Sequence, residues 1–276
     1  KRIVRMKLFF RQLGEGDPLI ILHGLYGSSD NWMTVARHLS SNFKVVVVDQ
    51  RNHGRSPHSP DHTYKLMVDD LVELFNDLSV DKATIIGHSM GGKVAMLFTA
   101  LFQSRVNSLV VADILPTSYT DEELGFDQVK VHGKILSAMQ MLNPESISSR
   151  DQLDEALSKS IKDFAVRQFL LKNFRRNEQG TFSWTINVDA LSKNLNALLS
   201  EVLPFEGSSI IKTPTLFIKG QYSNYIHPKG EDELPKFFSN FDVVTVPSAG
   251  HWLHAENTEY FLRVLDEFFL KQSFAK

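Results

Sequence analysis

The stretch Ile85-Ile86-Gly87-His88-Ser89-Met90-Gly91-Gly92-Lys93 decides the fold. In it, a Gly-x-Ser-x-Gly pattern follows an apolar run typical of a strand and opens a pattern typical of a helix. A tight strand–turn–helix connection leaves no room for side chains two positions before and after the serine, which explains the two glycines. This context predicts an elbow on which Ser89 is held in a strained turn, with its hydroxyl exposed above a sheet as a nucleophile.

Short β-branched runs alternate with longer amphipathic segments along most of the chain. Runs such as Val45–Val48 are apolar without alternation, which is typical of strands buried on both faces of a parallel sheet. The sequence therefore predicts an α/β fold with an eight-stranded, mostly parallel sheet and helices on both faces. The predicted strands lie at Ile3–Arg5, Lys7–Gln12, Leu19–Leu22, Lys44–Val48, Ala83–Ile86, Ser108–Ala112, Thr215–Ile218 and Val243–Val246, and the helices between them include Lys65–Leu78, Lys93–Leu101 and Glu259–Leu270.

The alternation stops once, between the sixth and seventh predicted strands. From Tyr119 to about Ser208 the sequence predicts amphipathic helices and no strand. We expect this segment, residues 119–208, to be a helical cap inserted into a core made of residues 1–118 and 209–276. Its stretch Val129–Met141 either lines an acyl channel or forms the ordinary core of the cap. The other helices expected there are Ser149–Ser160, Asp163–Phe174 and Asp189–Val202.

Composition excludes several classes of function. Thirty Lys and Arg against 32 Asp and Glu give a net charge of −2, so no basic footprint for nucleic acid is present. The absence of Cys removes disulfides, thiolate metal sites and a Cys nucleophile. No apolar run is long enough for a membrane span, and no dinucleotide, P-loop or zinc-protease motif is present. We expect a cytoplasmic monomer or small homo-oligomer that acts on a small molecule without a cofactor or a metal.

A serine nucleophile needs a base, normally a histidine oriented by a carboxylate. Of the ten histidines, His251 follows the last predicted strand through a short loop. Catalytic groups gather at the carboxyl ends of strands in open α/β sheets, so His251 is the predicted base. His254, one helical turn later, is the rival, and its position is more typical of a packing residue.

An acyl-transfer site also needs two N–H donors for the oxyanion. The sequence predicts the backbone N–H groups of Met90, directly after the nucleophile, and of Leu25, in the loop after Leu19–Leu22. His23 and His88 lie beside these donors and are counted as candidate substrate-binding residues, although for both a ring that braces its loop is favoured. The polar stretch from Asp49 to Ser56 is predicted to pin neighbouring loops rather than to react.

Four motifs in a fixed order resemble the α/β-hydrolase superfamily over essentially the whole chain. The resemblance is narrower to the YbfF-type esterases, and it implies a cofactor-free esterase acting on acyl esters, acyl-CoA thioesters among them, with Tyr225 at the substrate-contacting position. An arginine that the family has shortly after the acid has no counterpart in Thr117–Phe126, so a CoA-type anion would depend on Lys130 or His132. The motifs are Leu22-His23-Gly24, Asp49-Gln50-Arg51-Asn52-His53-Gly54-Arg55-Ser56, Gly87-His88-Ser89-Met90-Gly91-Gly92 and Gly250-His251, and the narrower resemblance rests on Asp113-Ile114-Leu115-Pro116 and Ala249–Glu256.

The position of the acid departs from the usual family pattern, in which a carboxylate follows the seventh strand. Here Gly220–Ile226 holds no carboxylate, and Ser223 stands at the usual position. Asp113 instead closes a buried run at the same sheet edge as Ser89, and we predict it to be the acid. The alternatives are an Asp113 that only braces the start of the cap, and an acid from the later carboxylates Glu231 and Asp232.

These observations predict a serine carboxylesterase or thioesterase that forms an acyl-enzyme at Ser89 with small to medium acyl substrates. A cofactor-free perhydrolase, lyase or acyltransferase on the same scaffold is the alternative from another reaction class. A ligand-binding protein without catalysis is a third, disfavoured because the nucleophile, the base and both oxyanion loops are all present.

Overall fold

The computed structural model describes residues 6–120, 127–176 and 180–274. They contain a seven-stranded sheet with the order β1-β3-β2-β4-β5-β8-β9, in which only β1 runs antiparallel to its neighbour. The α/β prediction is confirmed for this sheet, and the strand expected at Ile3–Arg5 lies outside the described residues. The strands are β1 (Phe10–Leu13), β2 (Asp17–Leu22), β3 (Phe43–Val48), β4 (Ala83–His88), β5 (Val106–Ala112), β8 (Thr215–Gly220) and β9 (Phe241–Val246).

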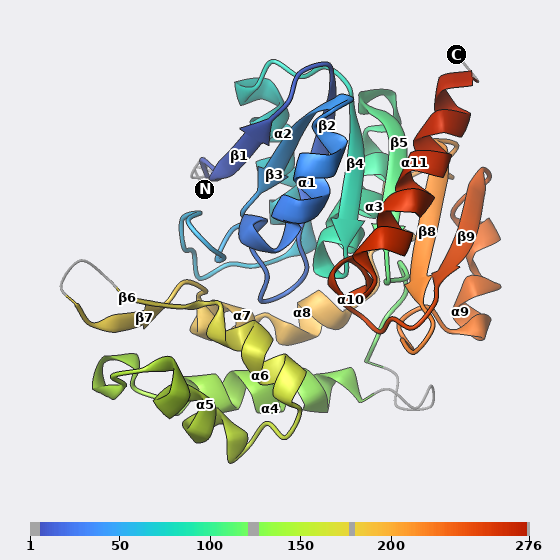
Figure 1. Cartoon of the computed structure of the whole chain (residues 1–276). Coiled ribbons are helices and arrows are strands. Elements are labelled where there is room, and N and C mark those ends of the chain that lie inside the picture. The colour runs from blue at the N-terminus through green and yellow to red at the C-terminus, as the bar shows by residue number, and fades with distance from the viewer. Residues whose placement is uncertain (1–5, 121–126, 177–179, 275–276) are drawn as a thin grey trace.

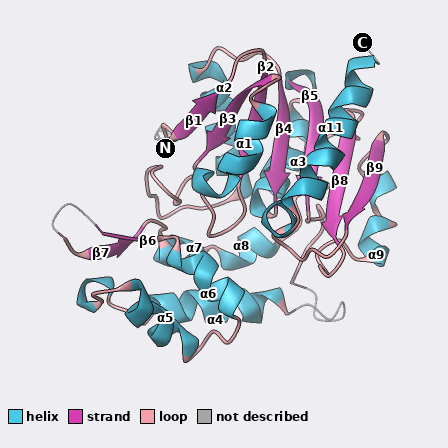
Figure 2. Ribbon diagram, in the orientation of Figure 1, coloured by secondary structure: helices cyan, strands magenta, loops and turns pink. Residues whose placement is uncertain are grey.

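The apolar strands are buried because helices cover both faces of the sheet (Figures 1 and 2). In β3, Val45 and Val47 pack on the face covered by α1 and α11, while Val46 and Val48 pack on the face covered by α2 and α3. Successive strand residues point to opposite faces, so a strand covered on both sides must be apolar throughout. The helices of this core are α1 (Met33–Leu39), α2 (Tyr64–Asp77), α3 (Met90–Leu101), α9 (Pro228–Glu231), α10 (Leu253–Glu256) and α11 (Thr258–Phe274).

The segment between β5 and β8 forms a helical layer at the end of the sheet to which the arrows of β4 and β8 point (Figure 1). We call this layer the cap. None of the described helices, in the cap or in the core, has the length and apolar composition needed to cross a membrane. The cap helices are α4 (Gln128–Gln140), α5 (Arg150–Ser158), α6 (Phe164–Leu171), α7 (Val188–Lys193) and α8 (Leu195–Leu199).

The prediction that this segment holds no strand is wrong. Strands β6 (Phe174–Arg176) and β7 (Phe182–Trp184) pair antiparallel as a small hairpin. The rings of Phe174 and Phe182 stack with centroids 4.5 Å apart. Three residues per strand are too few to display an alternating pattern, so the sequence revealed only the polar residues between them.

The single helix expected over Asp189–Val202 is two helices, α7 and α8, which meet at Asn194. The Asn194 side chain donates to the carbonyl of Ala190 at 2.8 Å and to that of Pro60 at 3.1 Å. An asparagine that binds backbone groups in this way competes with the helix ladder, and the helix breaks there.

Candidate active site

Ser89 lies on the turn between β4 and α3, with φ 51° and ψ −120°. A positive φ is strained for a non-glycine residue, as expected at a nucleophile elbow. Packing around the turn is tight. A Cβ added to Gly87 would lie 2.3 Å from the carbonyl oxygen of Gly91, and one added to Gly91 would lie 2.4 Å from that of Leu22. The glycines of the motif are therefore required by close backbone contacts.

Asp113 follows β5, next to the elbow, and its side chain is fully buried. Its Oδ1 accepts a hydrogen bond from the Gly220 backbone N–H at 3.2 Å. Its Oδ2 accepts from the hydroxyl of Ser223 and lies 2.7 Å from Nδ1 of His251. Ser223, at the usual family position of the acid, thus serves as a hydrogen-bond donor to a carboxylate supplied by the neighbouring strand.

His251 lies in the loop after β9 and is fixed from several sides. His88 donates from Nε2 to its backbone carbonyl at 2.8 Å. Glu256 accepts from the backbone N–H groups on both sides of it, Gly250 at 2.6 Å and Trp252 at 3.1 Å. The ring of Tyr225 stacks on the imidazole, with centroids 4.0 Å apart. With Nδ1 bound to Asp113, the other ring nitrogen is left to exchange a proton with a reacting group.

The loop after β2, which carries Leu25, packs against the elbow. A Cβ added to Gly24 would lie 3.1 Å from the Cβ of Ser89. His23 accepts at Nε2 from the Gln50 N–H at 3.0 Å, and its Nδ1 lies 2.8 Å from the Gly24 carbonyl oxygen. Both ring nitrogens of His23 therefore have hydrogen-bond partners, and burial lowers the pKa of the ring. His23 is also not among the residues that line the cavity described below. The structure gives His23 a bracing position.

The polar stretch after β3 consists of similar braces. Asp49 accepts from the backbone N–H of Ser29 at 2.6 Å and of Arg55 at 2.9 Å. Arg51 forms a buried, two-pronged contact with Asp70, at 2.6 and 2.7 Å. These bonds join the stretch to the loop after β2 and to α2, as its sequence predicts.

Ser89 and His251 line one cavity of about 270 Å³ between the core and the cap. Its wall is predominantly apolar, and Val131 and Ile135 of α4 belong to it, so the predicted segment Val129–Met141 contributes to the lining. No lysine or arginine is among the described residues that line it. They are Leu25, Tyr26, His88, Ser89, Gln128, Val131, His132, Ile135, Val166, Phe169, Leu170, Tyr225, His251 and Trp252.

Four polar side chains that line this cavity form a chain of polar contacts. The Tyr225 hydroxyl donates to Oε1 of Gln128 at 3.0 Å and lies 3.4 Å from Nε2 of His132, whose Nδ1 lies 3.2 Å from the Tyr26 hydroxyl. The Tyr225 hydroxyl has one hydrogen, and it is donated to Gln128, so Tyr225 must accept from His132. All three contacts are therefore satisfied when His132 carries its proton on Nε2 and its Nδ1 accepts from the Tyr26 hydroxyl. The sequence analysis missed this chain of contacts because its members come from three distant segments. The one available signal is that Gln128 and His132 lie one helical turn apart.

The two residues considered as substitutes for the missing family arginine are poorly suited to that role. Burial lowers the pKa of His132 to about 4, so its ring is neutral at pH 7. Lys130 is absent from the cavity lining, and its side chain is 66% exposed and lies 3.6 Å from Asp127. None of the described residues of the cavity wall therefore offers a cationic partner to a CoA-type anion.

Several histidines are buried in the neutral form, so we expect the folded state to lose stability in acid. Burial lowers the pKa of His132 to about 4 and those of His62 and His254 to about 3. The unfolded chain binds more protons than the folded one between these values and pH 6.5, so stability is lost as the pH falls below about 6.5. We expect the unfolding free energy, measured in denaturant between pH 7 and 5, to approach a slope of about 1.4 kcal/mol per pH unit for each histidine.

His254 allows a matched control for this prediction. Its ring stacks on Trp32, with centroids 4.2 Å apart and planes 8° from parallel, so it is a packing residue. The variant His254→Phe keeps an aromatic ring and removes one titrating group. The slope of the unfolding free energy against pH should be smaller in this variant by about 1.4 kcal/mol per pH unit, the contribution of one proton. An unchanged slope would contradict the assignment of acid sensitivity to this histidine.

Comparisons with known proteins place the chain in a family. The family described as "alpha/beta hydrolase fold" matches residues 17–133. The sn-1-specific diacylglycerol lipase ABHD11 of Danio rerio is 39% identical over 249 residues, which are 88% of this chain and 75% of that protein. Esterase YbfF of Escherichia coli is 35% identical over 248 residues, 90% of this chain and 91% of the relative.

A solved structure titled "Marine microorganism esterase" is similar over nearly the whole length of both chains. The TM-score is 0.90 and the sequences are 43% identical, with 95% of this chain and 99% of the other covered. The predicted resemblance to YbfF-type esterases is thereby confirmed. The chain belongs to the α/β-hydrolase fold family, close to the YbfF-type esterases, and is a hydrolase that acts on ester bonds.

Proposed function

We propose that this hydrolase cleaves carboxylic or thio esters of small to medium acyl groups through an acyl-enzyme at Ser89. The observation that carries the proposal is the 2.7 Å contact between Asp113 and His251, beside a cavity that His251 shares with Ser89. A buried carboxylate on Nδ1 fixes the imidazole tautomer and stabilises the imidazolium that forms during the reaction.

In the first step, His251 takes the proton of the Ser89 hydroxyl as the oxygen attacks the ester carbonyl. The backbone N–H groups of Met90 and Leu25 then stabilise the oxyanion. Met90 is the first residue of α3 and Leu25 lies on the loop packed against the elbow, which supports this assignment. His251 returns the proton to the leaving alcohol or thiol, and a water molecule activated by the same base releases the acid.

The size of the cavity supports small to medium acyl groups. Its volume of about 270 Å³ lies just below the roughly 300–1,000 Å³ of pockets that hold drug-sized ligands. A cavity of this size accepts a short to medium acyl chain. The relative from Danio rerio is named a diacylglycerol lipase. A whole diacylglycerol does not fit in this volume, so we propose that such a substrate would place only part of one acyl chain inside.

The roles of the remaining predicted residues follow from their positions. We propose that Tyr225 and His88, which line the cavity, contact the substrate, and that Tyr225 also holds the His251 ring by stacking. We propose that residues 119–208 act as the cap that closes the cavity, with residues 1–118 and 209–276 as the catalytic core. Val131, Ile135 and Phe169 of cap helices α4 and α6 support this division, since they line the cavity.

The proposal is tested with p-nitrophenyl esters of graded acyl length and the matching acyl-CoA thioesters, each with and without prior treatment by a fluorophosphonate. We expect a maximum of kcat/KM at short to medium chains and loss of all activity after one phosphonate has been added per chain. Equal activity on long-chain esters would contradict the proposed size limit. Activity that survives full phosphonylation would contradict the serine mechanism.

The acyl-length limit predicts a specific effect of Ile135→Phe. Ile135 is buried and lines the cavity from α4. A larger side chain there shortens the space for the acyl chain, and each excluded methylene is worth about 1–3 kcal/mol. We expect kcat/KM for the longest accepted ester to fall roughly tenfold or more, while acetate esters change little. The control is Lys134→Phe, an exposed position on the same helix, which should leave the length profile unchanged.

A further inference from the structure

Lys93 carries a buried amine that the proposed chemistry does not use. It lies on α3, one turn after Ser89, and only 1% of it is exposed. A buried ammonium group is costly unless other groups replace its water shell. Here the groups are backbone carbonyls and aromatic rings. Nζ donates to the carbonyl oxygens of Thr117 at 2.9 Å and Ser200 at 2.5 Å, and it lies 4.9 Å from the centre of the Tyr119 ring.

The two carbonyls belong to the segments that lead into and out of the cap. Thr117 lies between β5 and α4, and Ser200 directly follows α8. The two segments are joined by backbone hydrogen bonds from Tyr119 N–H to Leu199 O at 2.7 Å and from Val202 N–H to Pro116 O at 2.8 Å. We call residues 116–119 and 199–202 the cap junction. Lys93 thus binds both halves of the junction from the helix that begins at the elbow.

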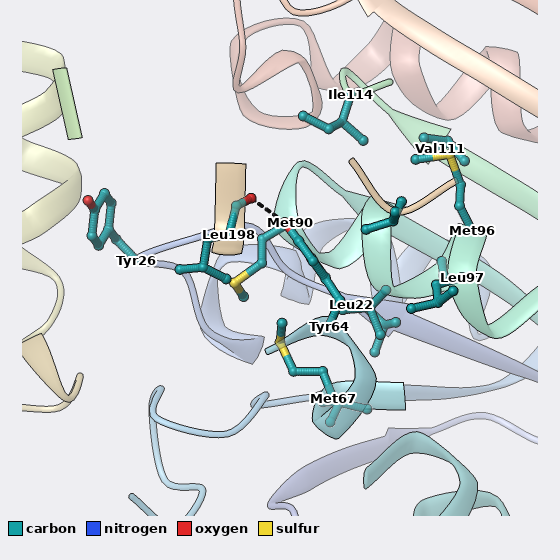
Figure 3. Packing of buried hydrophobic residues seen from close by; sticks show 14 of the residues in the cluster. Leu22, Tyr26, Tyr64, Met67, Met90, Met96, Leu97, Val111, Ile114 and Leu198 are labelled. Atoms are coloured by element: carbon teal, nitrogen blue, oxygen red, sulfur yellow. Dashed lines mark hydrogen bonds between the residues drawn. The ribbon is translucent and has the colours of Figure 1, made fainter. Parts of the chain in front are cut away.

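A core tyrosine reaches the same place. The hydroxyl of Tyr64, on α2, donates to the carbonyl oxygen of Leu198 at 2.7 Å, and its ring centre lies 5.8 Å from Nζ of Lys93. Figure 3 shows this contact among the buried residues of the same cluster. Met90, the first residue of α3, belongs to the same buried cluster as Tyr64 and Leu198, and Leu198 directly precedes the exit side of the junction. Displacement of the junction would therefore be felt next to Ser89.

We propose that Lys93 is a positioning residue for ester hydrolysis, which ties the cap junction to the helix carrying Ser89 and couples opening of the junction to the uptake of a proton. Its effect on activity rests on the proposed roles of Ser89 and the cap. The coupling between opening and proton uptake does not rest on those roles, because it is a property of the junction in the absence of substrate.

The direction of the coupling follows from burial. Burial lowers the pKa of Lys93 from 10.5 to about 7 in the closed junction. Opening admits water and returns the amine toward its ordinary value, so between about pH 7 and 10 the open form holds more protons. A rise in pH over this range therefore favours the closed junction, by at most tenfold per pH unit for one proton. Below about pH 7 both forms are charged and the dependence ends.

The groups that face Lys93 do not change this direction. Burial raises the pKa of Tyr64 on α2 and of Tyr119 in the junction, so both phenols stay neutral between pH 7 and 9. Glu201, on the exit side of the junction, raises the pKa of Lys93 and so opposes the effect of burial, which is the larger of the two. Of Lys93 and the described residues that face it, Lys93 is then the group that titrates in this range.

The test is amide hydrogen exchange of the whole protein at pH 7, 8 and 9, corrected for the intrinsic exchange rate. The reporters are the amides of Tyr119 and Val202, which bond across the junction, and the amides of β4 serve as a reference for global stability. We expect protection at the junction to rise with pH by up to tenfold per unit relative to β4. Junction protection that is independent of pH in the wild-type protein would overturn the proposal, and this measurement needs no variant.

Two variants complete the test. Lys93→Met keeps an unbranched side chain, one heavy atom shorter, and removes the titrating amine, so its junction protection should not change with pH. Thr99→Val, a buried position on the same helix whose hydroxyl bonds only within α3, should keep the wild-type slope. Retention of the slope in Lys93→Met would assign the titration to another group and overturn the proposal.

Activity provides a separate readout. In Lys93→Met we expect KM for the longest accepted ester to rise about fivefold, with a smaller change in kcat, because substrate is held less well under a loosened cap. A purely structural role would lower the active fraction and thus kcat without changing KM, and that result would also overturn the proposal. If Ser89→Ala remained active, the proposed function would fail, while the exchange result at the junction would still stand.

Discussion

Replacement of Ser89 by alanine is expected to lower kcat for ester hydrolysis by about 10⁴-fold or more, with the fold retained. The hydroxyl is the atom that would form the covalent bond, and Ala cannot replace it. The residual rate should come from the oxyanion donors and substrate binding alone. The measurement is kcat on the best p-nitrophenyl ester, together with the denaturation midpoint, which should not fall. Relief of the strained backbone is not expected, because alanine has the same Cβ at a φ of 51°.

A covalent probe makes this prediction residue-specific. A fluorophosphonate should add once to the wild-type chain, at the peptide that contains Ser89, and should not add to Ser89→Ala. Ser137→Ala, an exposed serine on α4, serves as the control and should be labelled like the wild type. Near-normal activity of Ser89→Ala, or a label on a different serine, would move the site elsewhere in the chain.

Local sequence predicted those parts of the molecule whose structure is set by neighbours along the chain. The elbow is of this kind, because Gly87, Ser89 and Gly91 act within one turn. The valines of β3 are another, since burial on both faces dictates an apolar run. Predicted strand ends in the main sheet lie within a few residues of the observed ones for the same reason. Asp113 was predicted as the acid in a different way, from the absence of a carboxylate where the family pattern has one.

Parts that depend on contacts across the chain were not predictable in this way. The Gln128–His132–Tyr225 contacts join α4 to a loop almost a hundred residues away. The role of Lys93 was equally hidden, because a lysine in a helix is normally read as a solvent-facing residue. Its hydrogen-bond partners are the carbonyls of Thr117 and Ser200, which are brought together by the return of the chain from the cap. Contacts of this kind depend on how distant segments are brought together by the fold, and the pattern of a single sequence does not show this directly.

The second large effect is expected for Asp113→Asn, which should lower kcat about 10⁴-fold with little loss of fold. Asp113 is 0% exposed and accepts bonds from Gly220 and Ser223 while it holds Nδ1 of His251. An amide has the same shape but carries its own donors, so it cannot accept all of these bonds at once. The imidazole would then lose its fixed tautomer and the charge that stabilises the imidazolium. The measurement is kcat with the denaturation midpoint.

Carboxylates further along the chain serve as controls. Glu231 pairs with Lys219 and Asp232 is exposed, so Glu231→Gln and Asp232→Asn should each change kcat by less than about twofold, as for surface ion pairs. If Asp113→Asn kept most of its activity while one of these variants lost it, the acid would follow β8, as in the usual family pattern.

The double variant Asp113→Asn with Ser223→Asp tests the same assignment in the other direction. The Ser223 hydroxyl already binds the carboxylate oxygen that contacts His251, so a carboxylate at position 223 lies within reach of the imidazole. It also occupies the position that the family normally uses. We expect it to recover kcat by roughly 10–100-fold over Asp113→Asn alone, about 1.4–2.7 kcal/mol of the lost stabilisation. Recovery of this kind would mean that the imidazole needs a buried carboxylate at Nδ1, and that either of two adjacent strand ends can supply it. No recovery, in a double variant that folds, would mean that a carboxylate at position 223 does not replace the one at position 113.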